Sequence, residues 1–457
     1  MKEKFFADGS FEKWKARFVA GGNNQSVEHL KSIYKSLTSP TVALESVMLA
    51  LGVAAAENHE IATVDVTGAF LECPLKDDDL VIVEVSAKVA KLLVETSPKY
   101  KRFLTKKGKL FLKLKKALYG CVQASMLWYE RLRAVLEGAG MKAHPYDKCY
   151  YMGNYNGSVV HVLFHIDDLL MTSKDAEALD NLVSIMRSKF AAVTVTRGKK
   201  HSYLAMNIVA NVETVSLDMC GYLDKTVEGK KLRAGVRSPC TGAVFEVDGD
   251  AEELIAEERA IFHTDVYRLL YMSKRTRMDI MVPVSFLSGR VAKPTTEDQT
   301  KLIRVLSYLA ATRNQKVFLK RGVELDFHCY IDASYACHCD GTSRTGILIF
   351  VAGAAVLGWT MKQSLVTLSS TEAEIVGLSD GTKYVLWSRE WFKRAGQDMT
   401  QPTVIFQDNQ ACLTLMAGDG VPRHRTRHLH VRFFFARDRV EKGDIVLEYK
   451  RTLDMIA

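Results

Sequence analysis

The stretch FHIDDLLMTS, residues 164–173, sets two adjacent carboxylates between two apolar runs. Because neighbouring side chains of a strand point to opposite faces, an unbroken strand would bury either Asp167 or Asp168 in an apolar layer. A buried carboxylate without a partner is costly. The apolar runs VVHVLFHI and LLMTS therefore predict the two strands of a β-hairpin whose turn carries both aspartates at the rim of a sheet.

A third carboxylate, Asp65, lies near the end of the strand-like run EIATVDV at residues 60–66. If this strand lies beside the hairpin, three carboxylates meet at one point and repel one another unless cations neutralise them. Oxygen ligands suit Mg²⁺, and two such ions can clamp the attacking and leaving oxygens of a phosphoryl transfer. The alternative is a plain turn, because Asp is a common turn residue, and an isolated Asp-Asp pair favours that alternative.

Length and composition bound the class of protein. The chain has 457 residues, 47% of them hydrophobic and 25% charged, which indicates a globular protein of several domains. No apolar run is long enough to span a membrane, and the first residues lack the apolar region of a signal peptide. We therefore expect no membrane partner and an intracellular location, either cytoplasmic, including within virus-like particles, or nuclear.

Positive charge is concentrated in one segment. Residues 99–116 contain nine Lys or Arg and no acid, with Tyr100, Phe103 and Phe111 interleaved. Cations neutralise phosphates and aromatic rings pack against bases, so the segment fits nucleic acid. A solvated hairpin with a basic edge explains the same pattern equally well, and the segment alone does not decide between them.

A second set of carboxylates follows in the last third of the chain. Asp332 ends the strand-like run HCYID, Glu374 lies in SSTEAE, and Asp408 ends VIFQD. The residues alone favour another role for Glu374, because Thr371 to Glu374 fits a helix capping box with Thr371 as N-cap.

The periodicity of apolar residues predicts several elements around these acids. Helices are expected at 41–57 and 175–190, the latter with one apolar face. A strand is expected for LVTLS at 365–369, followed by a helix that begins near Thr371.

Four runs, in chain order, resemble the reverse transcriptase of copia-type LTR retrotransposons: KARFVAGGNNQ (15–25), VDVTGAFLECPL (64–75), KKALYGCVQASMLWYERL (115–132) and FHIDDLLMTS. The resemblance implies an α+β fold, a right-hand polymerase with fingers, palm and thumb, followed by a ribonuclease H-like α/β domain. The implied boundaries are 1–235 for fingers and palm, 236–320 for a helical thumb or connection, and 321–457 for the ribonuclease H-like domain, truncated at its C-terminus.

Residue roles follow from the matched motifs. Asp65, Asp167 and Asp168 match the metal-binding triad, with the backbone carbonyl of Val66 as a further ligand. The implied nucleotide-binding residues are Phe70 as the steric gate against a ribose 2′-hydroxyl, Gln123 in the nucleotide pocket, and Lys15 and Arg17 on the triphosphate.

In the second set, Asp332, Glu374 and Asp408 match the metal-binding carboxylates of ribonuclease H, which reverses the preference for a cap at Glu374. The family carries a fourth carboxylate in a T-x-x-x-x-A-D element, where this chain reads RTLDMIA. Asp454 lies too early in that element to be an obvious substitute, so ribonuclease H activity stays open.

The implied cofactor is Mg²⁺, two ions per active site, with Mn²⁺ as a substitute. The implied partners are an RNA template, a DNA primer, RNA/DNA heteroduplex and deoxynucleoside triphosphates. The implied function is RNA-directed DNA polymerisation. The alternative is a degenerate retrotransposon fragment that only binds nucleic acid, suggested by departures from the family pattern at Gly21, Ser125, Met126, His165 and Met278.

Overall fold

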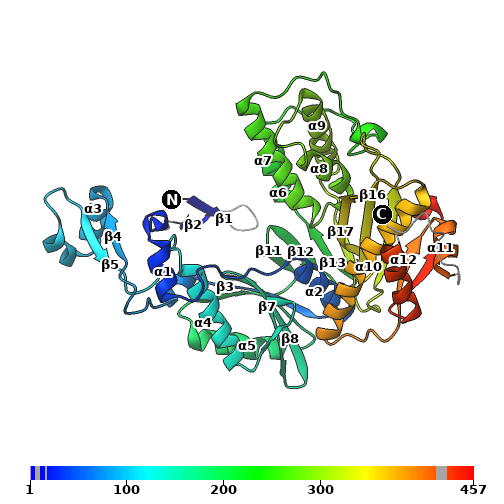
Figure 1. The fold of residues 1–457 in the computed structure, drawn as a ribbon. Helices are drawn as coiled ribbons and strands as arrows, with labels where there is room; N and C mark the ends of the chain where they lie inside the picture. Colours follow the sequence, from blue (N-terminus) through cyan, green and yellow to red (C-terminus); the bar gives the residue numbers. More distant parts are fainter. Residues whose placement is uncertain (1, 6–10, 16–17, 418–429) are drawn as a thin grey trace.

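The computed structural model describes residues 2–5, 11–15, 18–417 and 430–457. Figure 1 shows a central sheet, a small module that projects at one end, and a second large sheet at the other end. The mixture of antiparallel sheets, helices and one mixed sheet confirms the expected α+β class with a C-terminal α/β domain. No helix in the described part of the chain is long and apolar enough to cross a bilayer.

The central sheet has six antiparallel strands in the order β10-β3-β9-β8-β7-β6. The expected strand at 60–66 and both strands of the predicted hairpin are confirmed, as β3, β8 and β9. The strands are β3 (Glu60–Val66), β6 (Lys142–His144), β7 (Asp147–Tyr155), β8 (Ser158–His165), β9 (Asp168–Ser173) and β10 (Val193–Thr196).

Two amphipathic helices, α4 (Ala124–Gly138) and α5 (Ala176–Lys189), lie beneath this sheet in Figure 1. The predicted apolar face of α5 is buried, as Leu179, Leu182, Val183 and Met186 show.

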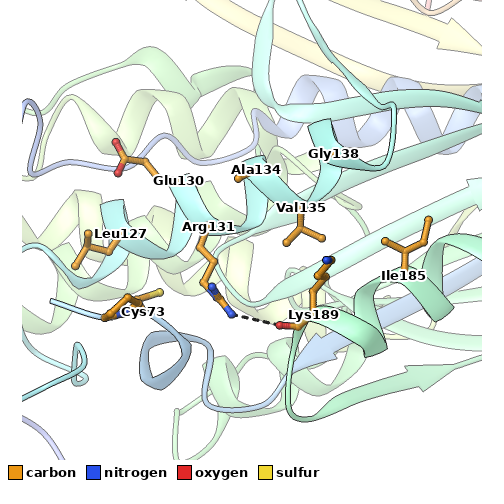
Figure 2. A pocket seen from close by; sticks show the side chains of 10 residues that line it. Cys73, Leu127, Glu130, Arg131, Ala134, Val135, Gly138, Ile185 and Lys189 are labelled. Carbon is orange, nitrogen blue, oxygen red and sulfur yellow. Dashed lines mark hydrogen bonds between the residues drawn. The ribbon is translucent and has the colours of Figure 1, made fainter. Parts of the chain in front are cut away.

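A hollow of about 600 Å³ is lined by residues of α4, of α5 and of the segment at Cys73 (Figure 2). Its walls include Leu127 and Val135, and Arg131 donates a hydrogen bond of 3.3 Å to the carbonyl oxygen of Lys189 at its edge. Burial raises the pKa of Cys73 to about 12, so this thiol stays protonated at neutral pH. The hollow thus offers no thiolate nucleophile.

The N-terminal part precedes the central sheet in the chain, and the projecting module follows β3 and η2. Its elements are β1 (Lys2–Phe5), β2 (Phe11–Lys15), η1 (Gly22–Asn24) and α1 (Val27–Ile33). The module consists of β4 (Ile82–Val85), α3 (Ala87–Thr96), η3 (Pro98–Phe103) and β5 (Leu110–Lys113), and η2 (Ala69–Glu72) precedes it.

A second antiparallel sheet, in the order β11-β12-β13-β14, leads to a group of helices. Its strands are β11 (Lys200–Tyr203), β12 (Met206–Ala210), β13 (Thr214–Asp218) and β14 (Val317–Lys320). The helices are α6 (Cys220–Val227), η4 (Gly242–Phe245), α7 (Ala256–Ser273), η5 (Met278–Ile280), α8 (Met281–Ser288) and α9 (Thr296–Ala311).

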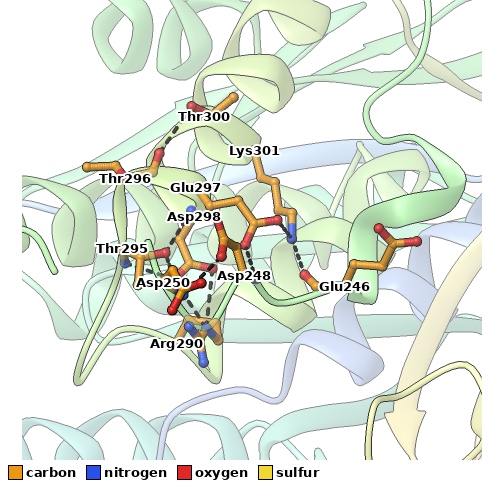
Figure 3. Close-up of polar contacts among 10 residues, drawn as sticks. All are labelled: Glu246, Asp248, Asp250, Arg290, Thr295, Thr296, Glu297, Asp298, Thr300 and Lys301. Atoms are coloured by element: carbon orange, nitrogen blue, oxygen red, sulfur yellow. Dashed lines mark hydrogen bonds and ion pairs between the residues drawn. The ribbon is translucent and has the colours of Figure 1, made fainter. Parts of the chain in front are cut away.

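The start of α9 holds the long loop before α7 (Figure 3). Thr295 and Asp298 form a reciprocal capping box, and Asp298 also accepts a hydrogen bond from Arg290 at 3.2 Å. Glu297 accepts from the backbone N–H of Asp248 at 2.9 Å. These acids therefore serve the helix terminus and the loop, as is usual for carboxylates in a first turn.

The C-terminal domain is a five-stranded mixed sheet in the order β17-β16-β15-β18-β19. The first three strands are antiparallel, and β18 and β19 run parallel to β15. Its elements are β15 (His328–Ser334), β16 (Arg344–Val351), β17 (Ala354–Lys362), α10 (Ser370–Arg394), β18 (Thr403–Gln407), α11 (Gln410–Ala417), α12 (His430–Glu441), β19 (Ile445–Tyr449) and η7 (Thr452–Asp454).

The expected strand at 365–369 is wrong, because residues 363–369 form a loop before α10. The side chains of Val366 and Leu368 are 57% and 75% exposed. The segment pairs with no strand in the described part of the chain, so its β-favouring residues produce no strand.

Helix α2 (Leu44–Ala56), predicted at 41–57, lies between the central sheet and the C-terminal domain (Figure 1). Eleven of its 13 residues are buried. The indole N–H of Trp391 in α10 donates to the hydroxyl of Ser46 at 3.2 Å, and Gly52 lies against Val351 of β16. Buried residues between Ala20 and Ile445 form one large hydrophobic cluster, apart from a small one in the projecting module. The implied domain boundaries at 235/236 and 320/321 stay a prediction.

We expect Gly52→Ala to lower the free energy of unfolding by about 1–3 kcal/mol, although alanine favours a helix over glycine by about 1 kcal/mol. A methyl group at Gly52 would lie 2.7 Å from Cγ1 of Val351. Urea unfolding followed by circular dichroism measures the change. Gly221→Ala in α6 is the matched control, because a methyl group there meets nothing within 4 Å. Adding Val351→Ala should restore part of the loss; a stabilising Gly52→Ala would contradict the packing.

Candidate active sites

The predicted hairpin is present, but its turn carries only Asp167, because Asp168 is already the first residue of β9. β8 ends at His165 and β9 begins at Asp168, and these two residues pair across the ladder. Ile166 and Asp167 form the two-residue turn between them. Asp167 is half-buried and Asp168 exposed, so the turn relieves the burial that an unbroken strand would impose.

The register of the sheet brings Asp65 to the same corner. Asp65 of β3 pairs with Asp168 of β9, and directly opposed residues share a face with their Cβ atoms about 5 Å apart. The backbone N–H of Val66 donates to the carbonyl oxygen of Asp167 at 3.2 Å. Thr67 donates to the Asp65 carboxylate at 2.9 Å. The triad therefore shares one sheet corner, and its precise ligand set stays a prediction.

The turn has a strained backbone at Ile166, and a hydrogen bond from one side chain stabilises this conformation. Ile166 has a φ of 60°, a left-handed conformation that is unusual for a β-branched residue. The indole N–H of Trp128, a fully buried residue of α4, donates to the carbonyl oxygen of Ile166 at 2.6 Å. Trp128 lies in a motif noted in the sequence, yet only the structure shows that it fixes the turn beside Asp167.

Two glycine-containing motifs cross at backbone contact beside this corner. The N–H of Ala20 donates to the carbonyl oxygen of Tyr119 at 2.7 Å. A Cβ at Gly22 would lie 1.9 Å from the carbonyl oxygen of Gly120, and a Cβ at Gly120 would lie 2.1 Å from that of Ala20. Only glycine fits at both positions, and this contact joins the first motif to the third.

Beyond the crossing, a buried network surrounds Gln123. Its side-chain amide donates to Asp79 at 2.6 Å, and its carbonyl oxygen accepts from Gln25 at 3.3 Å. The same Asp79 oxygen accepts from the hydroxyl of Tyr34 at 2.7 Å; burial and this hydrogen bond raise the pKa of Tyr34. Gln123 is fully buried, so in this structure its polar atoms serve the network, and its role toward a nucleotide stays a prediction.

Of the remaining nucleotide-binding candidates, Phe70 and Lys15 lie within the described residues and Arg17 does not. Phe70 is 9% exposed and packs edge-to-face against Tyr119, with ring centroids 4.8 Å apart. Lys15 ends β2, and Arg17 lies outside the described residues. The roles assigned to them stay predictions.

The second set of carboxylates is compact. Asp332 in β15, Glu374 in α10 and Asp408 after β18 present ligand atoms that all lie within 4.8 Å of one another, and they are the one such trio of His, Cys or acidic residues in the part of the chain that the structure describes. Gln407 donates to Glu374 at 3.1 Å, and Thr452 donates to Asp408 at 2.8 Å. A trio of oxygen ligands at this spacing fits a hard divalent cation.

Burial and mutual repulsion perturb these acids. Burial, followed by the charge of Asp332, raises the pKa of Glu374 to about 8. Burial and the charge of Asp408 raise the pKa of Asp332 as well. Such perturbation is typical of functional carboxylates, and a bound cation would reverse it by favouring the charged forms.

The capping alternative for Glu374 is wrong. The N-cap of α10 is Ser369, whose side chain accepts from the N–H of Glu372, and Glu372 accepts from the N–H of Leu368 at 2.7 Å. The N-cap thus lies two residues before Thr371, and the helix itself begins at Ser370. This shift leaves Glu374 one turn inside the helix, where it faces Asp332.

The final segment reaches the trio without adding a fourth acid to it. Asp454 is exposed and lies 3.8 Å from Arg451. The segment instead contributes Thr452 through its hydrogen bond, and Ala457 packs against Gly346, which pairs with Asp332.

Sequence comparison then decides the family. Residues 3–240, just over half of the chain, match the model of a family described as reverse transcriptase (RNA-dependent DNA polymerase). The chain belongs to this family. Its hairpin aspartates, Asp65 strand and glycine crossing all lie within the matched residues.

Retrotransposon polyproteins are similar to this reverse transcriptase chain along its length. The retrovirus-related Pol polyprotein from transposon RE1 of Arabidopsis thaliana is 30% identical over 460 residues and covers 100% of the chain. That from transposon TNT 1-94 of Nicotiana tabacum is 24% identical and covers 96%. The chain spans about a third of these polyproteins, 30% and 32%. The resemblance to copia-type elements is confirmed.

Solved structures are similar only at low scores. The prototype foamy virus protease–reverse transcriptase aligns with 99% of this chain and 50% of its own at 13% identity and a TM-score of 0.25. RNase H1 of Halobacterium salinarum aligns with 28% of this chain and 86% of its own at 15% identity and a TM-score of 0.21. The assignment of the fold therefore rests on the strand orders and the family match.

We expect Trp128→Phe to loosen the aspartate turn. The variant leaves the carbonyl of Ile166 without its donor, and loss of a buried hydrogen bond costs about 1–3 kcal/mol. Hydrogen–deuterium exchange of peptides from the 158–173 hairpin should rise about tenfold or more. Phe190→Leu is the control, because Phe190 packs against the Trp128 ring at 5.2 Å without donating to the turn. Equal exchange in both variants would contradict a specific role for the indole N–H.

We expect Glu374→Gln to flatten the pH dependence of stability in metal-free protein. The pKa of the Glu374 carboxyl is near 4.5 in the unfolded chain and about 8 in the folded one. The folded state therefore keeps this proton up to a higher pH. Stability is therefore greatest below the lower value and falls as the pH rises through the upper one. Urea unfolding at a series of pH values measures this fall in stability, which millimolar Mg²⁺ should offset in the parent chain and not in Glu374→Gln.

Glu372→Gln is the matched control, because Glu372 lies on the same helix outside the trio. It should keep the fall in stability with pH and its offset by Mg²⁺. The same flattened profile in both variants would contradict the assignment to Glu374.

Proposed function

We propose that the chain is the reverse transcriptase and ribonuclease H-like part of a copia-type Pol polyprotein and catalyses RNA-directed DNA synthesis. The observation that carries the proposal is the pairing of Asp65 with Asp168 beside the Asp167 turn, inside the family match. The proposed partners are an RNA template, a DNA primer, their heteroduplex and deoxynucleoside triphosphates. The proposed setting is intracellular, in the cytoplasm, in virus-like particles or in the nucleus.

The palm residues divide the work as follows. Asp65, Asp167, Asp168 and the backbone carbonyl of Val66 would hold Mg²⁺, with Mn²⁺ as a substitute. Such ions would supply positive charge against the transferred phosphoryl group. Lys15 and Arg17 hold the triphosphate, since Arg suits bidentate phosphate contacts, and Phe70 excludes a ribose 2′-hydroxyl. Gln123 lines the nucleotide pocket once it exchanges a partner of its present network.

A second activity is favoured by the compact trio. Asp332, Glu374 and Asp408 supply an all-oxygen set whose raised pKa values reflect close negative charge. We propose that they hold Mg²⁺ for hydrolysis of the RNA strand of a heteroduplex. The hydrogen bond from Thr452 to Asp408 orients one ligand of this set.

We expect the two activities to be lost separately. Asp167→Asn should reduce primer extension on poly(rA)/oligo(dT) roughly a hundredfold or more, because an amide cannot replace a charged ligand. Asp408→Asn should abolish cleavage of the RNA strand and leave extension. Extension is measured by incorporated nucleotide and cleavage by end-labelled RNA in the same reaction.

Asp250→Asn, at an exposed residue of the loop before α7, is the control that removes one negative charge outside both sites. Primer extension that survives Asp167→Asn would contradict the assigned palm site. A chain that binds the primer–template and never extends it would support the degenerate alternative.

A further inference from the structure

The projecting module, from β4 to β5, has its own core. Val85 of β4, Ala90 of α3 and Leu110 of β5 are buried together, separately from the main hydrophobic cluster. Figure 1 shows the module projecting from the central sheet at the end opposite α10, α11 and α12. Because the module has a core of its own, its surface has a defined shape and the side chains on that surface keep the same neighbours.

The cations of this module are presented to solvent. Of the nine Lys and Arg residues in 99–116, eight are exposed. Among the described residues, Lys109 is the one of the nine with an ion-pair partner, Glu84. Salt bridges within the protein therefore do not explain the charge, and an uncompensated cationic surface attracts a polyanion.

Partly exposed aromatic side chains lie between these cations, and the guanidinium of Arg102 lies over the Phe103 ring, 4.8 Å from its centroid. Phe103 and Phe111 are each 55% exposed, whereas Leu110, the neighbour of Phe111 on β5, is buried. Both rings line a hollow of about 550 Å³ whose rim includes Lys113, Lys115 and Lys116. A solvated basic edge needs no exposed phenylalanine, and the backbone of a duplex offers an aromatic ring nothing to stack on.

We infer that this hollow binds single-stranded nucleic acid, with Phe103 and Phe111 stacked on unpaired bases and Lys113, Lys115 and Lys116 on the phosphates. Base stacking on aromatic rings with cations along the backbone is the general mode of single-strand binding. The inference deepens the proposed function, on which it rests for its biological meaning, since the unpaired template is the single strand that a polymerase handles. For residues 99–116 it favours nucleic-acid binding over a solvated basic edge.

The test uses the full chain and a 5′-labelled 15-nucleotide oligo(U) RNA, with a blunt RNA/DNA duplex of equal length as the second probe. Fluorescence anisotropy measures both affinities. Phe103→Ala with Phe111→Ala should weaken binding of oligo(U) about tenfold or more, and binding of the duplex much less. Replacing Lys113, Lys115 and Lys116 by Gln should lower the slope of log affinity against log salt by roughly 2 for oligo(U).

Tyr146→Ala is the matched control, because Tyr146 is 49% exposed and lies between β6 and β7, outside the module. It should leave oligo(U) binding unchanged. Unchanged binding in the phenylalanine variant, equal loss for both probes, or binding of anionic lipid vesicles in place of oligo(U) would overturn the inference. Primer extension by the parent chain is scored separately, so failure of the proposed polymerase activity is distinguishable from failure of this site.

Discussion

The burial of α2 between two sheets is the contact on which the rest of the architecture depends. The helix is buried on nearly all sides, because it packs against β14 of the second sheet and against β16 and β17 of the C-terminal domain. Gly52 permits the close approach of Val351, and Ser46 accepts from Trp391. Two domains joined through a shared buried helix cannot rotate freely against each other, so the two carboxylate sites keep one spatial relation.

The two carboxylate sites solve the problem of like charge differently. In the palm, a turn and a register pairing expose Asp168 beside Asp65, and solvent screens their repulsion. In the C-terminal domain, Glu374 is 4% exposed, so repulsion is relieved by proton uptake instead. The palm site therefore depends on backbone conformation at Ile166, whereas the second site depends on ion and proton exchange.

The local pattern of the sequence predicted the hairpin, β3, α2 and the buried face of α5, because periodicity reports directly which face is apolar. It did not predict the short strands β11 to β13, which acquire their form from pairing with each other and with β14. The strand at 365–369 was wrong because no strand of the described residues pairs with it. The N-cap at Thr371 was wrong because Ser369 and Glu372 form an equally local cap two residues earlier. Trp128 and the Gly22–Gly120 crossing needed the structure, since their partners lie far away in the chain.

That crossing has a consequence for how such elements exchange genetic material. Recombination between related copies joins an N-terminal part from one parent to a body from another, and a breakpoint between residues 22 and 120 separates the two glycines. A recombinant folds at this contact only if both parents carry glycine at their side of it. The contact therefore acts as a compatibility requirement between segments almost a hundred residues apart, which neither segment reveals when compared alone.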